Sequence, residues 1–229
     1  MYNWKINLNT KDPRFPFIVI DNWYNEREEK VIWKELELYT ALPNDLKDRA
    51  EKDGPVAKNL DGTPKSKAFR FYVDQVYANG GKKYSPILNC ASKILNPSLV
   101  PYISQCLPYA RHFFSASKIF TLCSYYEEND HYHNHFDCGQ WTLLIWFAKD
   151  KELFTGGDFS LPESNNLIKL KHNRAVLFPG CCLHAVTPVK FKSPPEKEGL
   201  GRYTITHFIN SEEDGGSNHI SVKDLKEQK

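Results

Sequence analysis

The stretch HYHNHFDCGQWTLLIWFA, residues 131–148, joins a polar segment with three histidines to a long apolar run. In that run, from Trp141 to Ala148, almost every side chain is apolar. Successive side chains of a strand point to opposite faces of the sheet, so both faces of such a strand are apolar. We therefore predict that residues 140–148 form a central strand that is buried on each side, with one face lining a pocket.

The rest of the C-terminal half indicates more short strands. After Lys118 the strand-like runs follow one another with turns between them and without intervening helices. Such a series is typical of a sandwich or a jelly roll. The predicted strands cover residues 118–126, 140–148, 166–170, 174–178, 182–189 and 202–209.

The N-terminal half is predicted to support this core. An apolar run at residues 17–20 predicts a strand, and apolar residues at helical spacing predict a helix over residues 25–39. Residues 41–67 combine many charges with prolines and glycines, so we expect a long loop that is a candidate lid. Beyond it we predict a strand at residues 69–77 and helices at residues 84–95 and 97–107.

Length and composition limit the domain organisation and the partners. A chain of 229 residues is long enough for one large domain, and we predict a single domain with a support region (1–117), a jelly-roll core (118–210) and a polar tail (211–229). The net charge of +2 argues against an extended nucleic-acid footprint. No apolar stretch is long enough to cross a bilayer, and the N-terminus lacks the apolar region of a signal peptide. We therefore expect a cytoplasmic protein with no membrane contact.

The six cysteines do not have the spacing of a disulfide framework or of a zinc knuckle. An intracellular setting is also reducing. We predict free thiols, most of them buried, at positions 90, 106, 123, 138, 181 and 182.

Three residues of the C-terminal half have the types and the order of a metal site. His135 and Asp137 are two positions apart, so on a strand both side chains could reach one ion. His184, in a later strand-like run, is the best candidate for a third ligand. Two histidines and one carboxylate on one face of an octahedron leave the other positions open, which is the arrangement of non-haem iron(II) oxygenases.

Arg202 and Thr204 fit a second requirement of such a site, the binding of an acidic co-substrate. The planar guanidinium of an arginine can hold a carboxylate through two parallel hydrogen bonds. Thr204 lies two residues further along the predicted strand, so its hydroxyl would face the same carboxylate. Thr204 is also simply a good strand residue, and that reading stays open.

The C-terminal half resembles the prolyl 4-hydroxylase-like branch of the iron(II)- and 2-oxoglutarate-dependent oxygenases. The resemblance runs from Tyr126 to Phe208 and rests on five motifs in order, of which each alone would be weak. They are Tyr126 ahead of His135-Phe136-Asp137, the turn Gly156-Gly157-Asp158, the strand at residues 175–179, the segment at residues 184–189, and Gly201-Arg202-Tyr203-Thr204-Ile205.

The resemblance implies a mainly β fold with flanking helices, a double-stranded β-helix (jelly roll) with N-terminal support helices. It implies that His135, Asp137 and His184 bind Fe(II), and that Arg202, assisted by Thr204 and Tyr126, binds 2-oxoglutarate. It further implies dioxygen as co-substrate, ascorbate as an optional cofactor, and release of succinate and CO2.

The implied activity is hydroxylation, with a prolyl residue in a peptide or protein as the expected substrate. A free amino acid or another small molecule is the alternative within the same superfamily. Phe208 stands where the nucleic-acid repair branch carries a second arginine, which argues against base demethylation. A non-catalytic jelly-roll protein that binds a metal is the alternative from another class.

Two departures from the family pattern bear on the local structure. Asn129 stands in place of the glycine of the family motif, which puts the turn geometry in question, and residues 192–200 are interpreted as an inserted loop. A pair of ligands from His133 and His135 would suggest a cupin-like site, but no glutamate follows at a suitable spacing. We interpret His131 and His133 as loop residues near the entrance, and Gly156-Gly157 as a turn.

Overall fold

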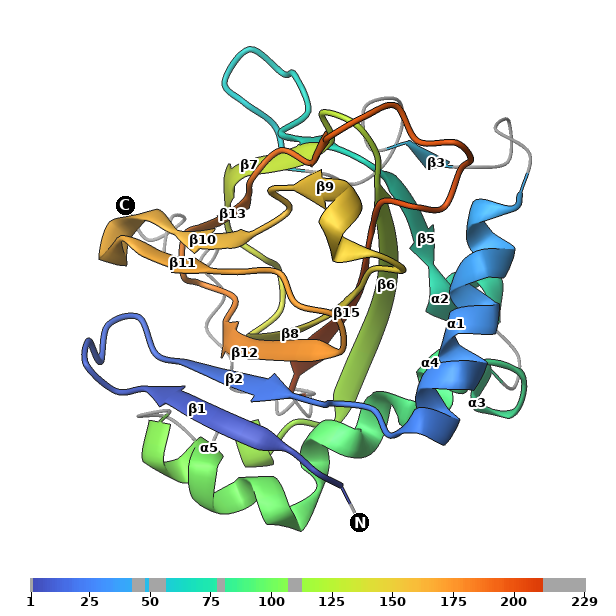
Figure 1. Ribbon diagram of the computed structural model, residues 1–229. Coiled ribbons are helices and arrows are strands. Elements are labelled where there is room, and N and C mark those ends of the chain that lie inside the picture. Colours follow the sequence, from blue (N-terminus) through green and yellow to red (C-terminus); the bar gives the residue numbers. More distant parts are fainter. Residues whose placement is uncertain (1, 43–47, 50–56, 78–80, 107–112, 212–229) are drawn as a thin grey trace, which may run out of the picture.

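The chain folds around two antiparallel sheets that face each other, as shown in Figure 1. The computed structural model describes residues 2–42, 48–49, 57–77, 81–106 and 113–211. Most strands of the sheets lie in the second half of the chain, as the sequence predicts. The strands are β1 (Lys5–Asn9), β2 (Phe17–Asp21), β3 (Asp48–Arg49), β4 (Ser66–Lys67), β5 (Phe69–Tyr72), β6 (Lys118–Tyr126), β7 (His131–His135), β8 (Trp141–Phe147), β9 (Phe154–Thr155), β10 (Phe159–Leu161), β11 (Asn166–Ile168), β12 (Arg174–Pro179), β13 (His184–Val186), β14 (Lys190–Phe191) and β15 (Arg202–Asn210).

The order of the strands is that of a jelly roll. The large sheet has the order β1-β2-β12-β8-β15-β6-β5-β3, and the smaller sheet has the order β11-β10-β13-β7-β4. Strands β9 and β14 form a separate pair. Neighbours in the sheets are distant in sequence, since β12 pairs with β2 and β13 pairs with β7. The predicted fold class, mainly β with a jelly-roll core and N-terminal support helices, is confirmed.

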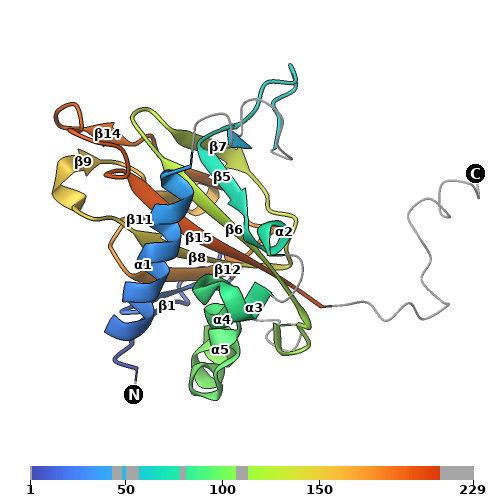
Figure 2. The same ribbon diagram turned by 90° about the vertical axis from the view of Figure 1, so that its right-hand side faces the viewer.

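Helices cover the outer face of the large sheet, and Figure 2 shows α1 lying across its strands. Helix α1 begins after Asn25, whose side chain accepts a hydrogen bond from the backbone of Glu28, and the Glu28 side chain bonds back to the backbone of Asn25. This capping box fixes the start of the helix. The helices are α1 (Glu26–Thr40), α2 (Val73–Val76), α3 (Gly81–Tyr84), α4 (Pro86–Cys90) and α5 (Val100–Cys106), and none is long and apolar enough to span a membrane.

Strand β8 separates two apolar cores, and all of its residues are buried. Leu143 and Ile145 lie in a core shared with α1, whereas Leu144 and Trp146 lie in the core between the two sheets. The predicted central strand is therefore present. Its second face, through Leu144, lines a cavity between the sheets.

Several predicted boundaries are wrong for local reasons. The predicted strand at residues 69–77 ends at Tyr72, and residues 73–76 are helix α2. Part of the predicted loop at residues 41–67 is a hairpin, because Asn59 and Lys65 donate backbone hydrogen bonds across it to Thr63 and Ala57. The other residues of the predicted lid include positions 43–47 and 50–56, which lie outside the described residues. Strand β7 is too polar to show an apolar pattern, whereas β1 alternates polar and apolar residues and was missed.

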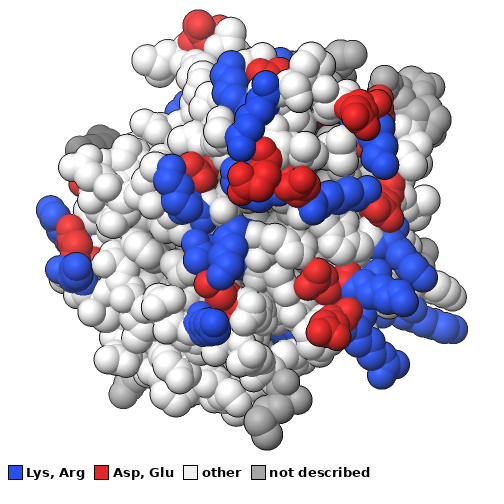
Figure 3. All heavy atoms as spheres, in the orientation of Figure 1, with Lys and Arg blue, Asp and Glu red and all other residues white. Residues whose placement is uncertain are grey.

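Charges on the surface are mixed in sign. On the face shown in Figure 3, acidic and basic side chains lie next to one another over the upper part, and several basic side chains gather at the lower right. Ion pairs among the described residues include Lys149 with Glu37 at 2.7 Å and Lys169 with Asp158 at 2.9 Å.

His207 gives β15 a pH-dependent contribution to stability. Its side chain is buried, and its Nδ1 lies 3.0 Å from the Thr121 hydroxyl on β6. Burial lowers the pKa of His207 to about 4, whereas an unfolded histidine has a pKa of about 6.5. The unfolded chain therefore binds more protons between these values, so the contribution is complete above pH 6.5 and is lost as the pH falls towards 4.

We expect the free energy of unfolding to fall by up to about 3 kcal/mol through this group between pH 6.5 and pH 4. The measurement is urea unfolding at several pH values for the wild type and for His207→Gln. The part of the slope of the free energy of unfolding against pH that one proton accounts for should be absent in the variant. Equal slopes for the two proteins would contradict this assignment.

Candidate metal centre

Strands β7 and β13 of the smaller sheet place two histidines opposite each other. His135 is the last residue of β7 and His184 is the first residue of β13, and the two are paired across the strands. Both side chains are buried, and their ring centroids lie 4.1 Å apart. The pairing thus brings together two imidazoles that are distant in the sequence.

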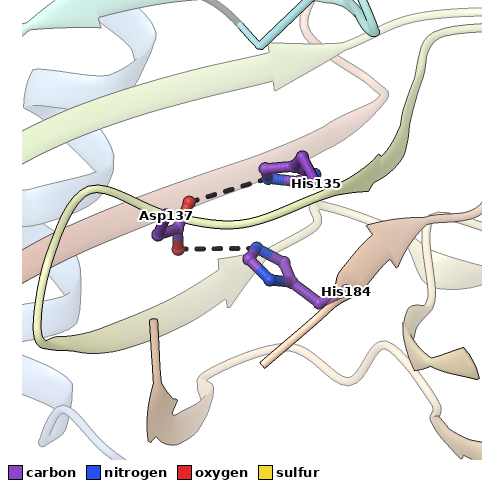
Figure 4. A group of neighbouring side chains, drawn as sticks. All are labelled: His135, Asp137 and His184. Atoms are coloured by element: carbon purple, nitrogen blue, oxygen red, sulfur yellow. Dashed lines mark ion pairs between the residues drawn. The ribbon is translucent and has the colours of Figure 1, made fainter. Parts of the chain in front are cut away.

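Asp137 joins the two histidines from a turn and not from a strand. Its backbone N–H donates to the carbonyl of Gly180, 3.0 Å away, which holds the turn against the end of β12. Its Oδ1 lies 3.6 Å from Nε2 of His135 and its Oδ2 lies 3.4 Å from Nε2 of His184, as drawn in Figure 4. The argument that a strand aims both side chains of the His-x-Asp triplet is therefore wrong, although the residues do meet.

The three side chains could hold one metal ion. Their ligand atoms lie within 4.8 Å of one another, and they are the only such group of three among the described residues. Nδ1 of His135 lies 2.8 Å from the carbonyl of His133, and Nδ1 of His184 lies 2.9 Å from the carbonyl of Cys182. A proton on each Nδ1 would leave each Nε2 unprotonated, with its lone pair available to a metal ion between the three side chains.

Electrostatics favours the forms that bind a metal. Burial lowers the pKa of His135, and this effect outweighs the opposing charge of Asp137. Burial alone would raise the pKa of Asp137, but the imidazoles of His135 and His184 bring it below its ordinary value. At neutral pH the site therefore presents a neutral imidazole beside a carboxylate, the forms that act as ligands.

Arg202, the first residue of β15, lines the same cavity as the three side chains. Its side chain is fully buried, with the guanidinium carbon 4.5 Å from the ring centre of Tyr126 and 5.8 Å from that of Trp146. None of its three guanidinium nitrogens has a hydrogen-bond partner in the structure. Burial lowers the pKa of Arg202, and the neighbouring Tyr126 hydroxyl offsets part of that shift.

Other polar atoms without a hydrogen-bond partner line the same cavity, among them the hydroxyls of Ser66 and Thr204. A buried guanidinium and a buried hydroxyl with nothing to bond are costly, and a carboxylate would satisfy both. The residues present therefore fit an acidic co-substrate held between Arg202 and the metal-ligand triad. Residues lining this cavity from the two sheets include Tyr126, Tyr132, His135, Asp137, Leu144, His184, Arg202 and Thr204.

Two residues of the site were missed by the sequence analysis. The hydroxyl of Thr142 on β8 donates to Oδ2 of Asp137 at 2.7 Å. In the sequence, a single threonine within an apolar strand indicates such a polar contact. The ring of Tyr132 stacks on that of His135 at 3.4 Å and 7°. A register shift between β7 and β13 puts Tyr132 and His135 on one face, which no regular alternation predicts.

Other predicted residues lie around the site. His131 and His133 belong to β7 and not to a loop, and their rings stack on each other outside the triad at 4.3 Å. The structure does not support a cupin-like pairing of His133 with His135, because His133 is exposed and does not line the cavity that contains His135. Asn129 has a φ of 66°, a conformation that asparagine tolerates, so the turn keeps its form without the glycine.

All six cysteines are free thiols. Cys106, Cys123 and Cys182 are buried, whereas Cys138 and Cys181 are exposed beside the two loops that carry Asp137 and precede His184. The prediction of free thiols agrees with the structure, but burial applies to only part of the set.

A family model that covers residues 120–210 describes the 2OG-Fe(II) oxygenase superfamily. Residues 120–210 match that superfamily. The match supports a 2-oxoglutarate-dependent dioxygenase that uses Fe(II), 2-oxoglutarate and O2. The matched segment contains the triad, Arg202, Thr204 and Tyr126. Among curated proteins, none matches the sequence of the chain.

Solved structures of 2OG-Fe(II) oxygenases share the fold. The prolyl-4-hydroxylase of Pseudomonas putida gives a TM-score of 0.57 at 12% identity, covering 93% of this chain and 95% of that chain. The viral collagen prolyl hydroxylase of Paramecium bursaria Chlorella virus-1, in a 2OG complex, gives 0.52 at 16% identity, covering 86% and 96%. An oxidoreductase of the 2OG-Fe(II) oxygenase family from Burkholderia pseudomallei gives 0.54 at 12% identity, covering 86% and 85%.

Replacing Thr142 with valine should weaken metal binding by about 10- to 100-fold, because the Asp137 carboxylate loses the hydroxyl that orients it. Valine has nearly the same shape, so the strand should still pack. Anaerobic Fe(II) titration and Co(II) absorption spectroscopy would both report the change, and Thr142→Ser should restore the affinity.

The matched control is Thr121→Val, which removes another buried threonine hydroxyl, one that bonds His207 away from the triad. That variant should bind metal as the wild type does. If Thr142→Val also keeps wild-type affinity, the hydroxyl does not orient the carboxylate.

Proposed function

We propose that the chain hydroxylates a prolyl residue in a peptide or protein. In this proposal His135, Asp137 and His184 bind Fe(II), and Arg202 binds the distal carboxylate of 2-oxoglutarate. The observation that carries the co-substrate assignment is the fully buried guanidinium of Arg202, without a hydrogen-bond partner, in the same cavity as the triad.

The residues of the site would divide the work as follows. The triad leaves one side of the ion open to the 2-oxo acid and to dioxygen. Arg202 and the Thr204 hydroxyl would orient the co-substrate through its distal carboxylate, and the ring of Tyr126 would support the guanidinium from below. The burial of these groups excludes water from the reaction.

When bound, Fe(II) supports the oxidation of 2-oxoglutarate by O2 to succinate and CO2, with the second oxygen atom inserted into a C–H bond of the substrate. Thr142 would hold the Asp137 carboxylate in position for the ion. The carbonyls of His133 and Cys182 would keep both histidines in the tautomer that binds the metal.

A groove beside the cavity supports a polymeric substrate. It is lined by Lys65 from the hairpin, by Tyr132 and His133 from β7, and by Val186 and Pro188 from β13 and the residues after it. Tyr132 and Val186 line both the groove and the cavity. A peptide could therefore lie in the groove with one residue directed at the metal centre. The two prolyl hydroxylases that share the fold add support for a prolyl residue.

Arg202→Ala should raise the 2-oxoglutarate concentration that half-saturates the enzyme, by an amount corresponding to about 2–5 kcal/mol, because a buried charged contact is lost. Succinate release as a function of 2-oxoglutarate concentration measures the change. Arg174→Ala is the control, since Arg174 pairs with Asp21 away from the cavity. An unchanged requirement in Arg202→Ala would remove Arg202 from the co-substrate site.

His184→Ala should lose both Fe(II) affinity and activity, because two ligands seldom hold the ion at micromolar levels. Equilibrium dialysis against Fe(II) without oxygen measures the affinity. The matched histidine variant is His172→Ala, which breaks a contact with Glu29 outside the site. Tight Fe(II) binding by His184→Ala would mean that another residue is the third ligand.

The first experiment on the intact chain is anaerobic titration with Fe(II) and 2-oxoglutarate, followed by oxygen. A visible charge-transfer band that decays with release of succinate would support the cofactor chemistry. Prolyl peptides, free proline and other free amino acids would then be compared for coupled succinate release. Turnover with a free amino acid but with no peptide would overturn the peptide assignment.

A further inference from the structure

A turn with two glycines connects β9 and β10. Gly156 and Gly157 both have positive φ, 73° and 66°. The turn is held to the chain after β13, because Gly157 donates to the carbonyl of Thr187 at 3.1 Å and Asp158 donates to the Thr187 hydroxyl at 2.9 Å. The backbone of the turn is thus fixed from one side by hydrogen bonds.

The other side of the turn touches the side chain of Arg202. A Cβ atom on Gly157 would lie 2.7 Å from Cδ of Arg202, 3.3 Å from a methyl of Val189 and 3.4 Å from a methyl of Leu170. Non-bonded carbon atoms prefer separations of about 3.5–4.0 Å, so any side chain here would displace the stem of Arg202 by about 1 Å. The aliphatic part of the Arg202 side chain can occupy its position because Gly157 has no Cβ.

The stem has little freedom to move elsewhere. Arg202 has no exposed surface, and its guanidinium lies over the rings of Tyr126 and Trp146. The wall behind the turn is also fixed, since Asp158 accepts hydrogen bonds from the backbone of Leu170 and from the Lys169 ammonium, both at 2.9 Å. The position of the guanidinium is therefore set by packing on both sides.

We propose that Gly157 is a positioning residue that sets how far the Arg202 guanidinium lies from the metal centre, and thereby selects a five-carbon 2-oxo diacid. The inference rests on the proposed function, in which Arg202 binds the distal carboxylate and the triad binds the metal that chelates the 2-oxo acid end. Both ends of the co-substrate are then held by rigid elements, so its length must match the spacing.

The test compares two ligands on the same protein. 2-Oxoglutarate and 2-oxopentanoate present the same 2-oxo acid end to the metal, but only the first has a distal carboxylate. Binding of each to the Mn(II)-loaded protein is measured by isothermal titration calorimetry, for the wild type and for Gly157→Ala. We expect Gly157→Ala to lower the affinity for 2-oxoglutarate at least about tenfold and to change the affinity for 2-oxopentanoate by no more than about twofold.

Chain length gives a second readout of the spacing. The ratio of affinities for oxaloacetate, 2-oxoglutarate and 2-oxoadipate, which have four, five and six carbons, should favour the five-carbon acid in the wild type. In Gly157→Ala that preference should shrink. A wild type that binds the six-carbon acid as tightly as the five-carbon acid would overturn the proposal.

The matched control is Gly62→Ala. Gly62 also has a positive φ, 84°, but a Cβ there would meet nothing within 4 Å. This variant carries the same kind of backbone strain without the contact to Arg202, so both ligands should bind as in the wild type. Mn(II) affinity and thermal unfolding, measured for each variant, show that the protein is folded and loaded.

Two results for Gly157→Ala would overturn the proposal: unchanged affinity for 2-oxoglutarate, or equal losses for both ligands, which would mean general damage. If this variant does not fold, Val189→Ala is used, because Val189 packs at the same position of Gly157 and its shortening changes that packing without backbone strain. It should weaken 2-oxoglutarate selectively. Wild-type affinities and length preference in Val189→Ala would then count against the proposal.

Arg202→Met separates this inference from the proposed function on which it rests. Methionine keeps an unbranched stem and removes the charge, so 2-oxoglutarate should lose its advantage over 2-oxopentanoate. If Arg202→Met binds both ligands as the wild type does, the co-substrate assignment itself fails. If Arg202→Met loses 2-oxoglutarate while Gly157→Ala keeps it, only the role of Gly157 fails.

Discussion

Burial of β8 on both faces is the constraint on which the rest of the fold depends. Its side chains are apolar on each side, so each face needs a cover. Helix α1 covers one face, around Leu143 and Ile145, and the smaller sheet covers the other, around Leu144 and Trp146. Because the second cover is a sheet, side chains from two sheets face each other across a narrow space. The triad comes mainly from one sheet and Arg202 from the other.

The sequence predicts most of this core because its strands are apolar and their turns contain glycine and proline. It predicts poorly where polar strands are held by neighbours, as in β7, whose residues are mostly histidine and other polar types. The residue types and order of the His-x-Asp triplet, His184 and Arg202 could be read from the sequence. The position of Asp137 could not, because a hydrogen bond to Gly180 from another part of the chain sets it. The stacking of Tyr132 on His135 likewise depends on a register shift.

The cavity balances opposite electrostatic demands within a short distance. The two imidazoles keep Asp137 ionised although it is buried, whereas the Arg202 guanidinium lies among aromatic rings without a hydrogen-bond partner. An isolated buried charge is costly, so the free energy of unfolding is lower without an anion beside the guanidinium than with one. A ligand that carries negative charge at both ends complements both the metal centre and the guanidinium. Co-substrate binding should therefore stabilise the folded chain as well as prepare it for reaction.

The pairing of β7 with β13 also has a consequence for folding. His135 and His184 face each other only when two segments far apart in the sequence have met, and Arg202 reaches the cavity only when β15 has paired with β6 and β8. Contacts of such long sequence separation form late, because loop closure must come first. A nascent or partly folded chain therefore lacks the complete ligand set, whatever local structure it has formed. If the triad binds a metal, tight binding would therefore require that these long-range strand pairings have formed.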